Sequence, residues 1–216
     1  MIENKYPRAV VSALRQALPY LALYRGRTFV TKIGGEIFDD AAALKRLFEQ
    51  VGVLHHLGVR CVVIHGGGPQ TSRLAEQLGV PTRLVAGRRV TDAETLACSL
   101  RVLAGELNAR AVAICRGLGV PAVGLSGVSG DLVVATKRPP REIDGEWVDY
   151  GEVGDLVSID RHLIDVQLDA GCVPIIAPIS ADEDGRILNC NADGVAAAVA
   201  VTLQADKLLL VTGAPG

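Results

Sequence analysis

The sequence predicts an α/β protein with an open, mainly parallel sheet covered by helices on both faces. Two observations lead to this fold class. Short apolar runs rich in β-branched residues alternate with segments whose apolar residues recur every three or four positions. Glycines follow two of those runs, directly after residues 28–33 and one residue after residues 60–64, as they do where a buried strand turns into a helix.

The first predicted element is a helix over residues 8–23, with an apolar stripe that Pro19 interrupts. It precedes the first strand and need not belong to the central layers. Two interpretations stay open, a helix packed on its own subunit and an arm that pairs with another subunit.

The next elements alternate in type. After the strand at 28–33, Asp39 or Asp40 can cap a helix that ends at Gly58. The further predictions are a strand ending at Ile64, a short helix from about 70 to 78, irregular chain from 80 to 90, and a long helix that Thr91 and Glu94 start as a capping box.

The second half continues the alternation with one departure. Residues 132–135 and 147–150 flank Pro139-Pro140 and Asp144-Gly145, a pattern typical of an antiparallel hairpin, expected at the sheet edge near a ligand. Around this hairpin we predict strands at 121–125, 173–177 and 207–211 and helices at 161–170 and 192–203.

Composition excludes several classes of protein. A hydrophobic content of 49% with 21% charged residues suits a soluble globular chain, and a formal net charge of −2 gives no bulk attraction to nucleic acid or to an anionic membrane. No apolar run approaches a membrane span and no signal-peptide pattern opens the chain, so a cytoplasmic location is expected. The five scattered cysteines are expected to be reduced packing residues.

The glycine turns predict an anion site. Glycine lets backbone N–H groups approach a ligand closely, and a following helix start adds unpaired donors. The turns are Gly34-Gly35 and Gly66-Gly67-Gly68. Lys32 precedes the first turn in a strand that is expected to be buried, where a lysine needs an anionic partner. Both common nucleotide fingerprints, G-x-x-x-x-G-K-[ST] and G-x-G-x-x-G, are absent.

Two more groups are candidates for a site. Asn189, Asn191 and Asp193 occupy alternate positions and would point the same way in an extended segment, although Asn191 or Asp193 could instead cap the following helix. Arg89 could hold a carboxylate with two hydrogen bonds, or could be a solvated surface residue.

Together these motifs resemble the amino acid kinase family, and within it the branch that phosphorylates N-acetyl-L-glutamate in arginine biosynthesis. The resemblance runs from about Ala17 to the last residue. It rests on Lys32-Ile33-Gly34-Gly35, His65-Gly66-Gly67-Gly68-Pro69-Gln70, Arg89-Val90-Thr91-Asp92, Gly124-Leu125-Ser126-Gly127 and residues 189–193.

The resemblance implies a three-layer αβα sandwich, divided into a helical arm (1–26), an amino-acid-binding portion (27–180) and the start of an ATP-binding portion (181–216). It also implies roles for single residues. Gly67, Gly68, Arg89, Asn189 and Asn191 would bind acetylglutamate, Lys32 and Asp193 would be catalytic, and Gly34, Gly35 and Gly66 would contact phosphate. ATP and Mg²⁺ are the implied cofactors, with no metal-ligating side chain assigned.

Assembly and completeness follow from the same resemblance. The arm favours a homo-oligomer, a dimer or a hexamer, with arginine as a possible feedback inhibitor. Gly213 stands where family members usually carry aspartate, and the family continues well beyond Gly216, so residues 1–216 alone are expected to lack appreciable kinase activity. The alternatives are the arginine-sensing, kinase-like domain of an acetylglutamate synthase or bifunctional synthase and kinase, and a non-catalytic binding module.

Overall fold

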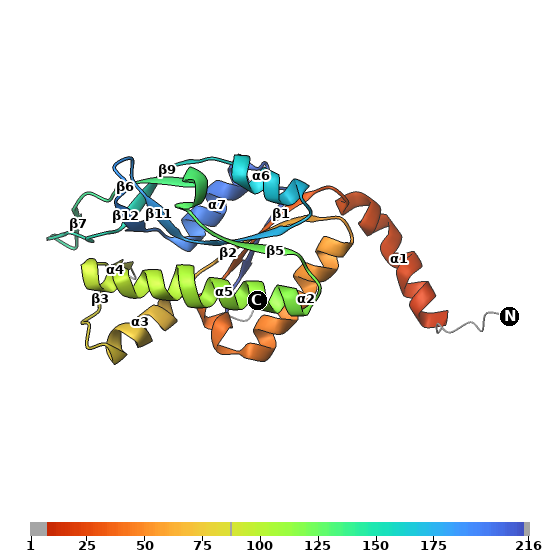
Figure 1. Cartoon of the computed structure of the whole chain (residues 1–216), viewed down its shortest axis with the longest axis horizontal. Helices are drawn as coiled ribbons and strands as arrows, with labels where there is room; N and C mark the ends of the chain where they lie inside the picture. Colours follow the sequence, from red (N-terminus) through yellow and green to blue (C-terminus); the bar gives the residue numbers. More distant parts are fainter. Residues whose placement is uncertain (1–7, 87, 214–216) are drawn as a thin grey trace.

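A five-stranded parallel sheet forms the centre of the molecule (Figure 1). The computed structural model describes residues 8–86 and 88–213. The strand order is β13-β1-β2-β10-β5, so the last strand along the chain lies beside the first. The strands are β1 (Thr28–Ile33), β2 (Arg60–His65), β5 (Ala122–Ser126), β10 (Val173–Ala177) and β13 (Lys207–Val211).

Helices cover both faces of this sheet, which confirms the three-layer αβα prediction. One face is covered by α2 (Ala41–His56) and by a long helix made of α4 (Ala93–Ser99), the π-helical segment η2 (Leu100–Leu107) and α5 (Asn108–Gly117). The other face is covered by α6 (His162–Asp169) and α7 (Ala192–Thr202). Figure 1 shows the two helical layers on opposite sides of the strands.

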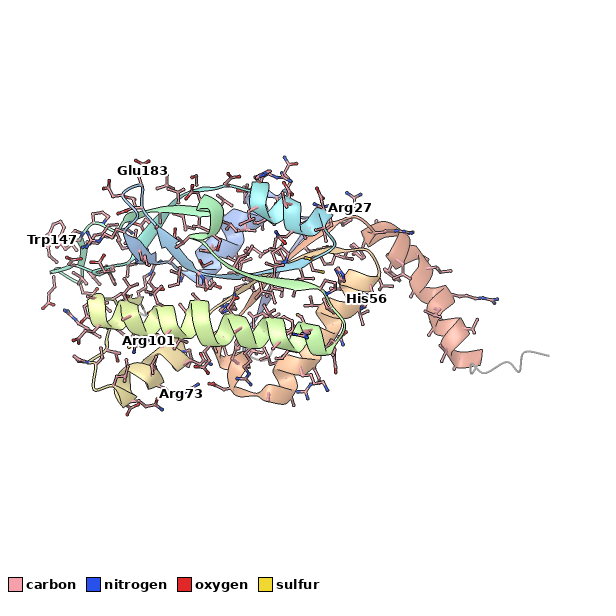
Figure 2. The ribbon with its side chains drawn as sticks, in the orientation of Figure 1. Arg27, His56, Arg73, Arg101, Trp147 and Glu183 are labelled. Carbon is pink, nitrogen blue, oxygen red and sulfur yellow. The ribbon has the colours of Figure 1, made fainter. Side chains whose placement is uncertain are left out.

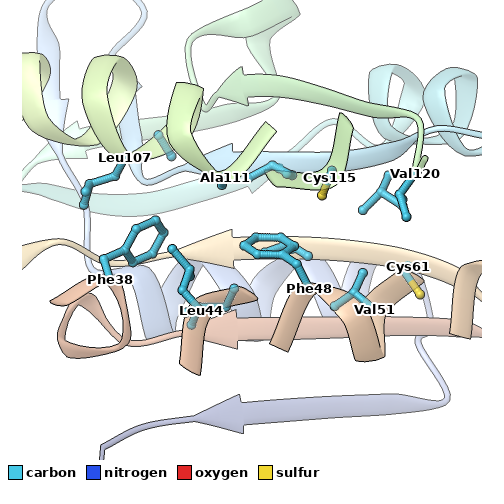
Figure 3. Packing of buried hydrophobic residues seen from close by; sticks show 14 of the residues in the cluster. Phe38, Leu44, Phe48, Val51, Cys61, Leu107, Ala111, Cys115 and Val120 are labelled. Carbon is cyan, nitrogen blue, oxygen red and sulfur yellow. The ribbon is translucent and has the colours of Figure 1, made fainter. Parts of the chain in front are cut away.

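The alternation of side chains along β1 separates two cores. Phe29 and Ile33 belong to the core beneath α2 and α5, where Phe38, Leu44 and Phe48 face Leu107, Ala111 and Cys115 (Figure 3). Val30 belongs to the core beneath α7. Because successive side chains in a strand point to opposite faces, Lys32 lies on the α7 side of the sheet.

Residues 80–90 form an antiparallel hairpin rather than the irregular chain that was predicted. Its strands, β3 (Arg83–Val85) and β4 (Arg88–Val90), pair Arg83 with Val90 and Leu84 with Arg89. Gly87 lies outside the described residues. Tertiary contacts support such short strands, since the Tyr150 hydroxyl donates to the carbonyl oxygen of Val85 at 3.4 Å. Local sequence alone does not show that support.

The predicted single hairpin is wrong, because its two strands belong to two nested hairpins. β6 (Val133–Lys137) pairs with β9 (Gly154–Ile159), while β7 (Arg141–Ile143) pairs with β8 (Glu146–Val148) across the predicted Asp144-Gly145 turn. β6 and β9 join a second sheet in the order β12-β11-β6-β9. Its other strands are β11 (Ile179–Ala181) and β12 (Ile187–Asn189). In Figure 2, Trp147 marks the β7–β8 hairpin at the end of the molecule opposite Arg27.

The cap of the long helix also differs from the prediction. Asp92 rather than Thr91 is the N-cap of α4, and its carboxylate accepts a hydrogen bond from the Thr95 amide at 2.8 Å. Thr91 is fully buried and forms a bridge with Gly151. A backbone pairing from a distant segment therefore shifts the helix start by one residue.

Helix α1 (Arg8–Tyr24) runs through Pro19 without a break and extends away from the body of the molecule (Figure 1). Val10, Leu14, Leu18 and Leu23 are exposed along it. Its last residue, Tyr24, packs against Phe29 with ring centroids 5.3 Å apart. The interpretation of a helix packed along its own subunit is therefore wrong for most of its length.

The described residues also show the state of the cysteines and the lengths of the helices. All five cysteines are free, and four of them are buried, as expected of packing residues. No helix in residues 8–86 and 88–213 is both long enough and apolar enough to cross a membrane. The remaining elements are the short helices η1 (Gly35–Asp39), α3 (Gly68–Gln77) and η3 (Ser129–Asp131).

Candidate active site

A cleft of about 480 Å³ opens where the carboxyl ends of the central strands meet the second sheet. Ligand sites in open α/β sheets form at this edge. Nine of the ten predicted site residues line the cleft, namely Lys32, Gly35, Gly66, Gly67, Gly68, Arg89, Asn189, Asn191 and Asp193. Gly34 does not line it, and its amide donates to the carbonyl oxygen of Val211 at 2.9 Å. This geometry does not support the predicted phosphate contact of Gly34.

The two glycine turns lie against each other and against the long helix. A Cβ atom on Gly35 would lie 2.9 Å from Cα of Gly67, and one on Gly67 would lie 2.6 Å from the side chains of both Leu103 and Leu107. Around Gly68 a Cβ atom would meet nothing within 4 Å. Close packing thus requires glycine at 35 and 67, a reason beyond the approach to an anion that the sequence suggests.

Gln70 connects the same two turns. Its side-chain amide nitrogen donates to the carbonyl oxygen of Gly35 at 2.6 Å and to Asp39 Oδ1 at 2.9 Å. Arg73, labelled on α3 in Figure 2, also binds Asp39, with its NH1 donating to Oδ2 at 3.1 Å. These contacts hold η1 and the start of α3 in a fixed relation beside Lys32.

Lys32 and Asp193 form an ion pair inside the cleft, with Nζ 3.0 Å from Oδ1. The Lys32 side chain is 12% exposed, so its charge lies largely out of water. Of the two arrangements left open for residues 189–193, the helix cap is confirmed, because Asn191 is the N-cap of α7 and its side chain accepts from the Gly194 amide at 2.8 Å. Helix start and cleft coincide here, so Asn191 caps the helix and lines the cleft at once.

Arg89 enters the cleft from β4 and has only uncharged partners. Its NH2 group donates to the carbonyl oxygen of Gly68 at 2.9 Å and to Ser72 Oγ at 2.6 Å. Its NH1 atom is buried and has no hydrogen-bond partner among the described residues. Burial lowers the pKa of the Arg89 guanidinium, although an arginine remains charged at pH 7. An unpaired buried donor on a cation is suited to an incoming carboxylate.

A short segment after β8 aligns the strands that carry these residues. The Thr91 amide donates to the Tyr150 carbonyl at 2.9 Å, and the Asn189 amide donates to the Glu152 carbonyl at 2.9 Å. Gly151 has φ +70°, and a Cβ atom there would overlap the carbonyl oxygen of Thr91. Residues 150–153, named here the bridging segment, therefore set β4 and β12 side by side.

Sequence reasoning missed three charged residues that line the cleft, Arg138, Arg88 and Glu36. Arg138 is 5% exposed and binds Asp155, whereas Glu36 is exposed and its Oε1 accepts from the Gly213 amide at 2.9 Å. No local pattern marked Arg138, which follows Lys137 and precedes two prolines. Residues 214–216, which follow Gly213 in the sequence, lie outside the described residues.

His65, at the end of β2, is fully buried beneath the glycine turn. One ring nitrogen lies 3.3 Å from the Asn108 side-chain amide, and burial lowers the pKa of His65 to about 4. The ring is therefore neutral at pH 7 and lies in the core, so it is structural. Across residues 8–86 and 88–213, no group of three or more His, Cys, Asp or Glu side chains could hold a metal ion.

Comparison with known proteins agrees with the geometry. Acetylglutamate kinase from Myxococcus xanthus is 44% identical over 211 residues, covering 95% of this chain and 68% of that protein. N-acetylglutamate synthase from Neisseria gonorrhoeae has a similar structure, in complexes with coenzyme A and N-acetyl-glutamate (TM-score 0.81, 34% identity) and with coenzyme A and L-arginine (TM-score 0.80, 33% identity). This chain is covered to 95% in both comparisons but spans 46% and 48% of the synthase chains.

The amino acid kinase family model matches residues 27–216, the whole chain after the helical arm. The cleft, the two glycine turns and the buried lysine all fall within that match. The chain belongs to the amino acid kinase family.

Proposed function

We propose that this chain binds N-acetyl-L-glutamate and forms the acceptor side of an ATP-dependent phosphoryl transfer to its γ-carboxylate. The product is the acyl phosphate, an intermediate of arginine biosynthesis. Similarity to acetylglutamate kinase along 95% of the chain supports this reaction. The unpaired NH1 of Arg89, buried in the same cleft as the Lys32–Asp193 pair, is the observation that carries the proposal.

The acceptor contacts follow from the lining of the cleft. Arg89 binds the α-carboxylate, because its free donor is already buried and needs a negative partner. Asn189 and Asn191 supply polar contacts from the opposite wall, and Gly67 and Gly68 bring backbone close to the ligand. Near Gly68 the open space leaves room for that approach.

The phosphoryl transfer needs alignment and positive charge rather than a base. The γ-carboxylate is ionised at pH 7, so its oxygen attacks the γ-phosphorus directly while the bond to ADP breaks, with no proton moved. Lys32 stabilises the charge on the transferred group, Asp193 orients Lys32, and backbone around Gly35 and Gly66 lies beside them. Mg²⁺ supplies further positive charge when bound with ATP, and a nucleotide-borne Mg²⁺ needs few protein ligands.

The remaining parts of the proposal concern assembly and location. Exposed leucines along α1 favour a homo-oligomer, a dimer or a hexamer formed through that helix. Arginine is proposed as a feedback inhibitor, and the cytoplasm as the site of action. The division at residues 26 and 180 stays a prediction.

Titration calorimetry of the chain with acetylglutamate tests the acceptor site. Arg89→Met should weaken binding at least about tenfold, because each lost charged contact costs on the order of 1.5–3 kcal/mol. Arg83→Met is the matched control, since Arg83 is an exposed residue of the same hairpin, and it should bind as the parent does. Lys32→Met should keep acceptor binding. Equal affinities for the Arg89 and Arg83 variants would contradict the assignment.

A second candidate function is the arginine-sensing, kinase-like domain of an acetylglutamate synthase. The structural similarity to the Neisseria synthase favours it. Calorimetry separates the two, because a sensor domain should bind arginine without binding acetylglutamate in the Arg89 cleft, whereas the kinase site should bind acetylglutamate.

A further inference from the structure

Arg138 is a buried cation in the wall of the cleft, directly after β6. It is 5% exposed and lines the cleft together with Asn189 and Cys190. Its Nε and NH2 atoms donate to Asp155 Oδ1 at 2.8 and 2.6 Å, and its guanidinium carbon lies 5.5 Å from the centre of the Tyr150 ring. Two hydrogen bonds and an aromatic face hold the guanidinium in one place, so its charge acts at a fixed point of the cleft.

Asp155 does not cancel this charge by itself, because it serves a second arginine. Arg141 NH2 donates to Asp155 Oδ2 at 2.9 Å, so the three side chains together carry one net positive charge. Neither Asp155 nor Arg141 lines the cleft, and the Arg141 side chain is 55% exposed. The guanidinium of Arg138 therefore lines the cleft, whereas the carboxylate that it shares with Arg141 does not.

Arg138 lies beside the predicted acceptor contacts. Its amide donates to the carbonyl oxygen of Val153 at 2.8 Å, and Val153 in turn bridges to Asn189. Burial raises the pKa of the Cys190 thiol to about 11, the charge of Arg138 lowers it, and the charge of Asp155 has a smaller raising effect. Cys190 sits between Asn189 and Asn191, so the field of Arg138 reaches the segment that supplies both amides.

The charge balance of the cleft shows what this cation does. Lys32 is paired with Asp193, and the lining also contains the exposed Glu36 and Arg88, whose charges are of opposite sign. Arg89 and Arg138 have no carboxylate of their own within the cleft lining. A dicarboxylate is attracted by such a site, whereas an ammonium group among the same residues meets like charge.

We propose that Arg138 is a specificity-determining residue, which makes the cleft accept an N-acylated glutamate and reject free glutamate. The amino group of glutamate is protonated at pH 7, and acylation turns it into a neutral amide. The two ligands share both carboxylates and differ in this one charge. Rejection of the free amino acid by a fixed like charge is discrimination by repulsion rather than by extra contacts. The inference rests on the proposed acceptor function and names the residue that selects the acceptor.

Calorimetry of the chain and three variants with acetylglutamate and with glutamate tests the inference. The measured quantity is the ratio of the two dissociation constants. Arg138→Gln removes the charge but keeps a donor for Asp155, and it should reduce the preference for acetylglutamate at least about tenfold. Arg138→Lys keeps the charge and should retain most of the preference. Arg83→Gln is the control, because it removes an exposed arginine that neither lines the cleft nor contacts Asp155, and it should leave the ratio unchanged.

The outcomes separate the inference from the proposed function. A parent chain that binds neither ligand overturns both. A parent that prefers acetylglutamate, with the same ratio in Arg138→Gln as in Arg83→Gln, overturns only the role of Arg138. Loss of packing would weaken both ligands together and leave the ratio as it is, so a merely structural role gives the second result. Arg138→Met provides a second neutral variant, and thermal unfolding of each variant checks that it is folded.

Discussion

At the scale of single residues, the cleft depends on polar groups whose partners lie far away in the sequence. His65 follows four buried residues of β2 and is itself fully buried, yet its ring nitrogen finds the Asn108 amide from the long helix. Asn108 also donates to the carbonyl oxygen of Ile175 at 2.9 Å. This pair ties β2, β10 and the start of α5 together directly beneath the glycine turn.

The buried neutral state of His65 predicts a pH-dependent stability. The folded pKa is about 4 against an ordinary value of 6.5, so between these values the unfolded chain binds a proton that the folded chain does not. The free energy of unfolding should therefore fall as the pH drops through this window, by about 3 kcal/mol at most from this residue. Urea unfolding at pH 7 and pH 4.5 measures the change. His65→Gln should flatten it, whereas His56→Gln, at the end of α2, should keep the parent's change. Identical changes for parent and His65→Gln would contradict the prediction.

At the scale of elements, the bridging segment decides how the acceptor residues meet. The strand that carries Arg89 and the strand that ends in Asn189 belong to different sheets. Residues 150–153 pair with Thr91 on one side and with Asn189 on the other. The two sides of the cleft are therefore joined by backbone hydrogen bonds, and the Asn189 side-chain amide also donates to Thr91 Oγ1 at 3.4 Å.

At Gly151, the pairing between the bridging segment and Thr91 leaves no room for a side chain. It has φ +70°, and a Cβ atom would overlap the Thr91 carbonyl oxygen, whereas Gly145 in the β7–β8 turn has φ +84° with nothing within 4 Å of its Cβ position. Gly145→Ala should cost only the strain of a positive φ, about 1 kcal/mol. Gly151→Ala shares that strain and adds the overlap, so it should cost clearly more and also weaken acetylglutamate binding. Urea unfolding and calorimetry compare the two variants. Equal losses of stability and of acetylglutamate binding would contradict this role of Gly151.

At the scale of the whole molecule, α1 stands apart from the rest. The helix joins the body at its last residue, Tyr24, and a series of apolar residues along it remains exposed. Burying apolar side chains of this size is worth roughly 1.5–3 kcal/mol each, so exposed ones in series favour a partner. The interpretation as an arm that pairs with another subunit stays a prediction, and it now has a defined surface.

Charge on that surface should separate the subunits. Leu14→Glu together with Leu18→Glu places two carboxylates on the apolar side of α1, so the mass measured by sedimentation velocity should fall toward that of a smaller species. Gln16→Glu adds charge at another exposed position of the same helix and serves as the control. The thermal midpoint of the core should barely change, because α1 contributes little to either core cluster. A parent chain that is already monomeric would contradict the arm interpretation.

The sequence by itself determined the features that local pattern encodes. Periodicity places the strands and helices of the central layers, and glycines directly after β1 and β2 mark the turns where Lys32 and the anion site lie. These signals are readable because each one depends on neighbours within a few residues, through side-chain alternation and backbone freedom.

Only the tertiary structure decided which distant segments meet. β6 pairs with β9 rather than with residues 147–150, and Gly34 faces β13 instead of the cleft. Arg138 reads in the sequence as one more basic residue before two prolines, and it becomes part of the cleft only through Asp155 and Tyr150. The physical reason is that burial and hydrogen-bond satisfaction belong to contacts between residues far apart in the chain, which no local pattern contains.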